Sequence, residues 1–77
     1  MSAFRTLKNI EREAKAKDGQ AYELIIGLRS GRTIRGGAFA VDGTTALKFD
    51  EEIGAGERRI TYIEYDAIEQ VTPIWLR

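Results

Sequence analysis

Apolar and polar residues follow one periodicity in the first 18 residues of the chain and another after it. In this first segment apolar residues recur every three or four positions, the spacing of one helix face, at Phe4, Leu7, Ile10 and Ala14. Ser2 is a residue type that caps helix N-termini, and Gly19 tolerates the left-handed conformation that follows a helix C-terminus. The pattern therefore predicts one N-terminal helix over residues 1–18.

From Ala21 onward the apolar positions alternate with polar ones, which is the spacing of a strand. Ser30-Gly31 and Asp42-Gly43 are turn signals, and the pair Gly36-Gly37 inside a strand pattern is typical of a sharp bend. Five strands follow from this pattern, at residues 21–29, 32–41, 45–49, 58–65 and 68–72.

The remaining segments complete a single domain. Residues 50–57 have the composition of a loop throughout. Pro73 cannot donate to a strand ladder, so it is expected to end the last strand and to leave an apolar tail at 74–77. The prediction is one α+β domain, mainly β, over residues 1–77. Its helix precedes a five-stranded, strongly bent antiparallel sheet over residues 21–73 that is expected to form a small barrel.

The composition excludes most catalytic and metal chemistry. The 77 residues include no Cys and no His, which excludes a disulfide framework, a thiolate nucleophile, a Cys/His zinc site and a His acid–base relay. The acidic residues at 50–52 lack the alternating spacing of a calcium loop and are expected to be solvated. We therefore expect no enzyme activity, no cofactor, no metal site and no small-molecule substrate.

Size and hydropathy indicate a cytoplasmic protein that oligomerises. The longest apolar run is far shorter than the ~20 residues of a membrane span, and the first residues are charged too early for a signal-peptide core. We therefore expect no membrane insertion and no export. A domain this small has a limited core, so without disulfides or a metal it gains stability from assembly with other copies.

Charge is balanced over the chain but divided along it. Residues 1–35 contain eight basic and four acidic residues, whereas residues 36–77 contain four basic and eight acidic residues. Arg29, Arg32 and Arg35 cluster around one predicted hairpin, and a planar guanidinium suits phosphate groups and base edges. This cluster is a candidate anion-binding face; the alternative is a solvated face with local ion pairs.

Three segments have the order and spacing of a known family. Residues 28–36 (LRSGRTIRG) fit the pattern Leu-x-Asn/Asp-Gly-x-x-apolar-x-Gly, with Gly31 at the hairpin turn and Gly36 at the bend. Val41-Asp42 occupies the place of an apolar–Asp pair after the bend, and residues 60–71 fit a strand, a very short turn and a strand. In these segments the chain resembles the Sm-like family of Sm, LSm and bacterial Hfq proteins.

The resemblance implies an N-terminal helix, a barrel of five bent strands and a ring of about five to seven identical subunits. In Sm-like rings the fourth strand of one subunit pairs with the fifth strand of the next. This implies a subunit interface formed by Ile60, Tyr62, Ile63, Ile68 and Val71. The family's role implies single-stranded RNA as the partner, bound here through the arginine cluster and an inter-subunit hairpin face.

The chain departs from the family at its RNA-binding positions. Sm and LSm proteins have Asp-x-x-Met-Asn after the second strand, and its Asn reads a base; this chain has Gly43 and Thr44 within that segment and Ala46 in place of the Asn. Hfq has a Lys-His pair where this chain has Tyr65 and Asp66. The latter two are candidates for a stacking and hydrogen-bonding base pocket; alternatively, Asp66 caps the turn and Tyr65 packs at a subunit boundary.

Two functions therefore remain as hypotheses. The first is a homo-oligomeric Sm-like ring that binds RNA through atypical sites, including Gly43 and Thr44. Tyr22 or Phe39 would supply the stacking aromatics of such a site, unless both are core residues. The second is a protein-interaction scaffold of the same fold that has lost RNA binding. A different small barrel, such as an SH3-like module, is the alternative fold.

Overall fold

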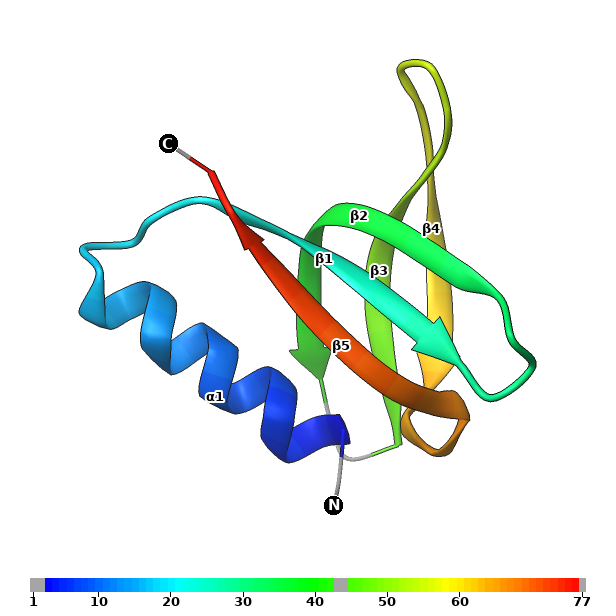
Figure 1. Ribbon diagram of the computed structural model, residues 1–77, viewed down its shortest axis with the longest axis horizontal. Helices are drawn as coiled ribbons and strands as arrows, with labels where there is room; N and C mark the ends of the chain where they lie inside the picture. Colours follow the sequence, from blue (N-terminus) through cyan, green and yellow to red (C-terminus); the bar gives the residue numbers. More distant parts are fainter. Residues whose placement is uncertain (1–2, 43–44, 77) are drawn as a thin grey trace.

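The computed structural model describes residues 3–42 and 45–76, in which one helix precedes a five-stranded antiparallel sheet (Figure 1). The elements are α1 (Ala3–Ala16), β1 (Tyr22–Leu28), β2 (Thr33–Asp42), β3 (Ala46–Gly54), β4 (Glu57–Glu64), the short 3-10 turn η1 (Tyr65–Ala67) and β5 (Ile68–Trp75). The predicted α+β class and the order of the elements are confirmed. No helix in these ranges is long and apolar enough to cross a membrane.

Helix α1 lies along the sheet and packs mainly against β5 (Figure 1). Three residues of the predicted apolar stripe, Leu7, Ile10 and Ala14, are buried, and the fourth, Phe4, is half-buried. The helix ends at Ala16, and Asp18 and Gly19 after it both adopt positive φ angles, of 59° and 73°. The Gly19 N–H donates a hydrogen bond to the Ala14 carbonyl at 2.8 Å, which satisfies one of the last carbonyls of the helix.

The strand order in the sheet is β4-β3-β2-β1-β5, so β4 and β5 are its two edges. All neighbouring strands run antiparallel. The bend in β2 curves the sheet strongly (Figure 1) and lies at the predicted glycine pair. The β2–β3 register shifts between Gly36 and Ala38, which is a bulge.

Close approach of β3 explains the glycine at this bend. A Cβ added to Gly36 would lie 2.2 Å from the carbonyl oxygen of Asp50 and 2.6 Å from the ring of Phe49. The ring of Phe49 is fully buried. Any larger residue at position 36 therefore forces β2 away from β3.

The core lies between the curved sheet and the helix. Its fully buried side chains come from alternate positions of β1 and β3 and from α1, and are Leu7, Leu24, Ile26, Leu47 and Phe49. Tyr65 in η1 is also buried, and its ring contacts the ring of Phe4 edge to face at 5.5 Å. The turn between β4 and β5 is thereby anchored to the helix.

The loop predicted over residues 50–57 is wrong. Strands β3 and β4 continue until only residues 55 and 56 separate them. Opposite charges face each other across this hairpin, and they offset the cost of placing acidic residues in a strand. Nitrogen-to-oxygen distances are 3.1 Å for Arg58 with Asp50 and 3.3 Å for Arg59 with Glu51.

The predicted end of the last strand at Pro73 is also wrong. Strand β5 continues to Trp75, which pairs with Tyr22, while Pro73 lies opposite Leu24. Because β5 is an edge strand, a proline is tolerated where its missing N–H faces the free side of the sheet. Ile74 and Trp75 therefore belong to the sheet rather than to an apolar tail.

Candidate nucleic-acid interface

The three arginines of the predicted cluster have three different environments. Arg29 joins the β1–β2 hairpin to η1: its backbone N–H donates to the Ala67 carbonyl at 2.9 Å, and its Nε donates to the Asp66 carbonyl. Arg29 therefore lies beside Asp66, another predicted site residue. Its guanidinium already has a backbone partner, which holds the hairpin against the turn between the two edge strands.

Arg35 forms an ion pair with Glu23 on the neighbouring strand. Its cross-strand partner is Ile25, so Glu23 lies one diagonal step away on the same face. The hydrogen bonds that Arg35 donates to Glu23, and the negative charge of that carboxylate, raise the pKa of Arg35. An anion that approaches Arg35 competes with a carboxylate already in place.

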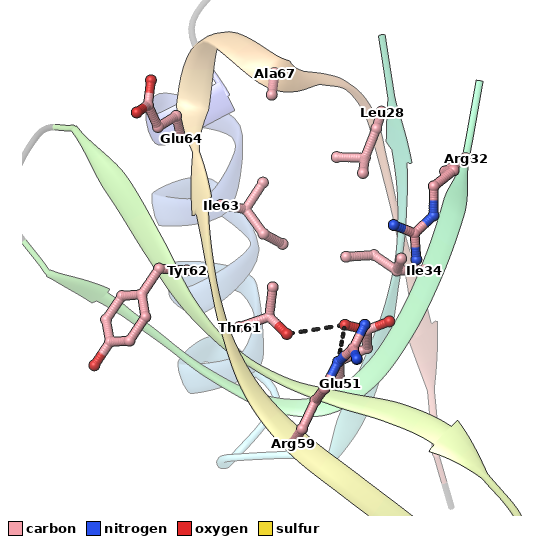
Figure 2. A pocket seen from close by; sticks show the side chains of 10 residues that line it. All are labelled: Leu28, Arg32, Ile34, Glu51, Arg59, Thr61, Tyr62, Ile63, Glu64 and Ala67. Atoms are coloured by element: carbon pink, nitrogen blue, oxygen red, sulfur yellow. Dashed lines mark hydrogen bonds and ion pairs between the residues drawn. The ribbon is translucent and has the colours of Figure 1, made fainter. Parts of the chain in front are cut away.

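Arg32 lines a pocket of about 300 Å³ between the β1–β2 hairpin and β4. We call it the hairpin pocket and define it by its walls and its polar groups: Leu28, Arg32, Ile34, Glu51, Arg59, Thr61, Ile63 and Ala67. In Figure 2 the side chains of Leu28 and Ile34 on one side and of Ile63 on the other point toward one another. Within the described residues the Arg32 guanidinium makes no ion pair.

Alternation along β4 divides its side chains between two surfaces. Thr61 and Ile63 point into the hairpin pocket, whereas Tyr62 and Glu64 point to the opposite side of the strand (Figure 2). Since β4 is an edge strand, its backbone and its outward side chains remain accessible while its inward side chains form one wall of the pocket.

Glu51 on β3 supplies the buried charge at one end of this pocket. It is 5% exposed, and its Oε1 accepts a hydrogen bond from Thr61 Oγ1 at 2.9 Å and another from Arg59 Nε at 3.3 Å. A buried carboxylate is costly unless it is paired in this way. The hairpin pocket therefore combines apolar walls with two guanidinium groups and the buried carboxylate of Glu51, while Glu64 and Tyr62 lie at its rim on the outward side of β4.

The other predicted site residues do not join this pocket. Tyr65 is 7% exposed and packs on Phe4, so in this conformation its ring is not accessible for stacking on a base. Asp66 is exposed. Gly43 and Thr44 lie outside the described residues, as does the predicted helix cap Ser2.

The two candidate stacking aromatics are half-buried and lie elsewhere. Tyr22 and Phe39 meet edge to face at 5.9 Å and line a separate groove of about 360 Å³ beside the end of α1. Tyr22 also packs on Trp75 at 5.1 Å, and Lys17 lies over the Trp75 ring at 3.9 Å. Burial and the charge of Glu11 raise the pKa of Tyr22.

The residues predicted for the subunit interface fall into two groups. Ile60 and Tyr62 on β4 are 54% and 69% exposed. Ile63 and Ile68 are buried in the core of the subunit, and Val71 is half-buried. Only the outward residues of β4 thus offer large apolar surfaces to another molecule among these five.

Sequence reasoning missed Glu51, Thr61 and Arg59 as members of a site. The alternation of residues 59, 61 and 63 indicates one shared face, but the composition of the partner segment, residues 50–57, predicts a loop. Among the described residues, no group of three or more acidic, His or Cys side chains is placed to hold a metal ion.

Comparison with known proteins finds no matching family model, no similar curated protein and no similar solved structure.

Proposed function

We propose that the protein is an Sm-like subunit that closes its bent sheet into a small barrel, assembles into a homo-oligomeric ring and binds single-stranded RNA. The order of the helix and strands, the strand order β4-β3-β2-β1-β5 and the bulge at Gly36 support the fold assignment. They agree with the segments of the sequence that resemble the family.

The two edge strands support the ring. An unpaired edge presents free backbone donors and acceptors and invites pairing with another chain. Ile60 and Tyr62 add apolar surface to the β4 edge. A contact between β4 of one subunit and β5 of the next pairs both edges at once, and a head-to-tail contact of this kind closes into a ring when the rotation allows it.

The composition of the hairpin pocket is the observation that carries RNA binding. Its apolar walls suit the faces of a base, and the guanidinium of Arg32, which makes no ion pair within the described residues, suits phosphate oxygens. Of the predicted cluster, Arg32 is the arginine we assign to RNA, because Arg29 and Arg35 already have partners. The affinity is expected to be lower than three available arginines would give.

Native mass spectrometry of protein purified at low salt without nuclease tests both parts of the proposal. We expect an assembly of about five to seven subunits that carries additional mass removable by ribonuclease. A monomer contradicts the ring. An assembly without nucleic acid that also fails to bind single-stranded RNA in a titration contradicts RNA binding.

Charge-matched variants locate the RNA contact. Arg32→Gln should weaken RNA binding severalfold and reduce its salt dependence, because it removes one phosphate contact. Arg12→Gln is the control: it removes the same charge from the exposed side of α1, where Arg12 lies outside the hairpin pocket. Fluorescence anisotropy with a labelled single-stranded RNA at several salt concentrations measures both. Equal effects of the two variants would contradict the assignment.

A protein-interaction scaffold is the second candidate. The engagement of Arg29 and Arg35 and the exposure of Ile60 and Tyr62 favour it, since they reduce the available positive charge and leave apolar surface. A partner bound through such a surface should show little dependence on salt, whereas binding through phosphates weakens steeply as salt rises.

A further inference from the structure

The hairpin pocket contains a carboxylate oxygen that the fold leaves available. Both hydrogen bonds to Glu51 end on Oε1, one from Thr61 and one from Arg59. A carboxylate has about four acceptor positions, so Oε2 retains its own. Glu51 is nine-tenths buried and lines the pocket, and within the described residues no hydrogen bond reaches Oε2. The pocket therefore offers a hydrogen-bond acceptor.

We infer that the hairpin pocket selects guanine, with Glu51 Oε2 accepting hydrogen bonds from the N1–H and N2–H groups of the base. This inference rests on the proposed RNA-binding function and adds base selectivity to it. Guanine presents two adjacent donors on its Watson–Crick edge, and both can converge on one carboxylate oxygen that acts as a bifurcated acceptor.

The other bases place an acceptor next to the donor. Adenine and cytosine have a ring nitrogen acceptor beside the amino group, and uracil has a carbonyl on each side of N3–H. An acceptor directed at a carboxylate is repelled, and its burial without a donor is costly. These bases therefore lose binding energy at Glu51 even where their faces fit the walls.

Arg32 has five N–H donors, so in addition to the proposed phosphate contact it can donate to the remaining polar edge of guanine. O6 and N7 of guanine are both acceptors, and arginine is their most frequent specific partner in protein–nucleic acid complexes. Arg32 and Glu51 both line the pocket, so a donor group and an acceptor group face the same ligand space. Leu28, Ile34 and Ile63 supply the apolar contacts to the faces of the ring.

A purely structural role for Glu51 makes a different prediction. Glu51 also connects β3 to β4 through Arg59 and Thr61, so a variant at this position affects stability as well as binding. The test must therefore include the unmodified protein with different ligands. Inosine monophosphate is the matched probe, because it differs from guanosine monophosphate only in lacking the N2 amino group.

The experiment is a titration of 15N-labelled protein with the 5′-monophosphates of guanosine, inosine, adenosine, cytidine and uridine, followed through the backbone amides of Ile34, Thr61 and Ile63. We expect guanosine monophosphate to bind about tenfold or more tightly than the adenosine, cytidine and uridine compounds, with inosine monophosphate between them. Equal affinities, or equal affinities of the guanosine and inosine compounds, overturn the inference.

Variants and RNA separate this failure from that of the proposed function. Glu51→Gln, if its spectrum is folded, should lose the preference for guanosine over inosine monophosphate, whereas Arg12→Gln should keep it. A single-stranded RNA that binds with no preference for guanine overturns the selectivity and leaves the proposed function standing. An absence of binding by both RNA and nucleotides overturns both.

Discussion

Gly36 lies where β2 passes close to β3, against the buried ring of Phe49. Two independent observations favour a glycine at position 36. The family pattern has a glycine at this position, and the structure leaves no space for a Cβ next to the Asp50 carbonyl. A backbone carbonyl that is paired in a sheet cannot move aside as a flexible side chain can.

Gly36→Ala should therefore destabilise the fold by at least about 2 kcal/mol through overpacking, or abolish it. Gly27→Ala is the matched control, because a Cβ at Gly27 would meet the Gln70 Cβ at an ordinary 3.5 Å. Urea unfolding followed by circular dichroism measures both variants. If Gly36→Ala were as stable as Gly27→Ala, the close approach of β2 and β3 would be wrong.

The arginine cluster shows how much of the site the sequence could predict. The residue type and the position near one turn were readable, and Arg32 does line a pocket. The partners of Arg35 and Arg29 could not be predicted in this way, because they are distant in the sequence. Arg35 contacts Glu23 because the β1–β2 register places both on one face of the sheet. Arg29 contacts η1 because the chain returns to the β1–β2 hairpin there. Local patterns contain neither fact.

At the scale of elements, the β3–β4 hairpin is the largest difference from the prediction. Acidic residues and glycines between positions 50 and 57 have low strand propensity, so the composition favoured a loop. Cross-strand pairing with Arg58 and Arg59 outweighs this propensity. The β3–β4 hairpin forms the polar end of the hairpin pocket. Because a loop was predicted over residues 50–57, the shared site of Glu51, Arg59 and Thr61 was not predicted.

The two ion pairs of this hairpin should contribute unequally to stability. Arg59→Gln is expected to cost about 1–3 kcal/mol, because it removes a partner from the buried carboxylate of Glu51. Arg58→Gln should cost less than about 1 kcal/mol, because Asp50 is more exposed and water replaces the lost partner.

Urea unfolding of both variants at the same pH and salt concentration compares the two free energies of unfolding. Equal costs would mean that Thr61 alone satisfies Glu51. In that case Arg59 could contact phosphate without lowering the free energy of unfolding.

At the scale of the whole molecule, periodicity predicted the helix and most of the strands, but the sheet order needs more. Adjacent strands β1 to β4 pair in sequence order, as short turns favour. Strand β5 instead pairs with β1 and not with its neighbour in sequence, β4. The bend at Gly36 and the contacts of η1 with Phe4 and Arg29 favour this return of the chain to β1. This arrangement leaves two edges unpaired by their own chain.

The exposed face of β4 provides the test of assembly that does not depend on RNA. Tyr62→Glu and Ile60→Glu should dissociate the proposed ring into folded subunits, because both side chains are exposed in the single subunit and their burial in a subunit contact would contribute at most about 1.5–3 kcal/mol per residue. Ile53→Glu near the tip of the same hairpin is the control for added charge, and it should leave the assembly intact. Size-exclusion chromatography with light scattering gives the mass, and circular dichroism confirms folding. Retention of the full assembly by both β4 variants would place the subunit contact elsewhere.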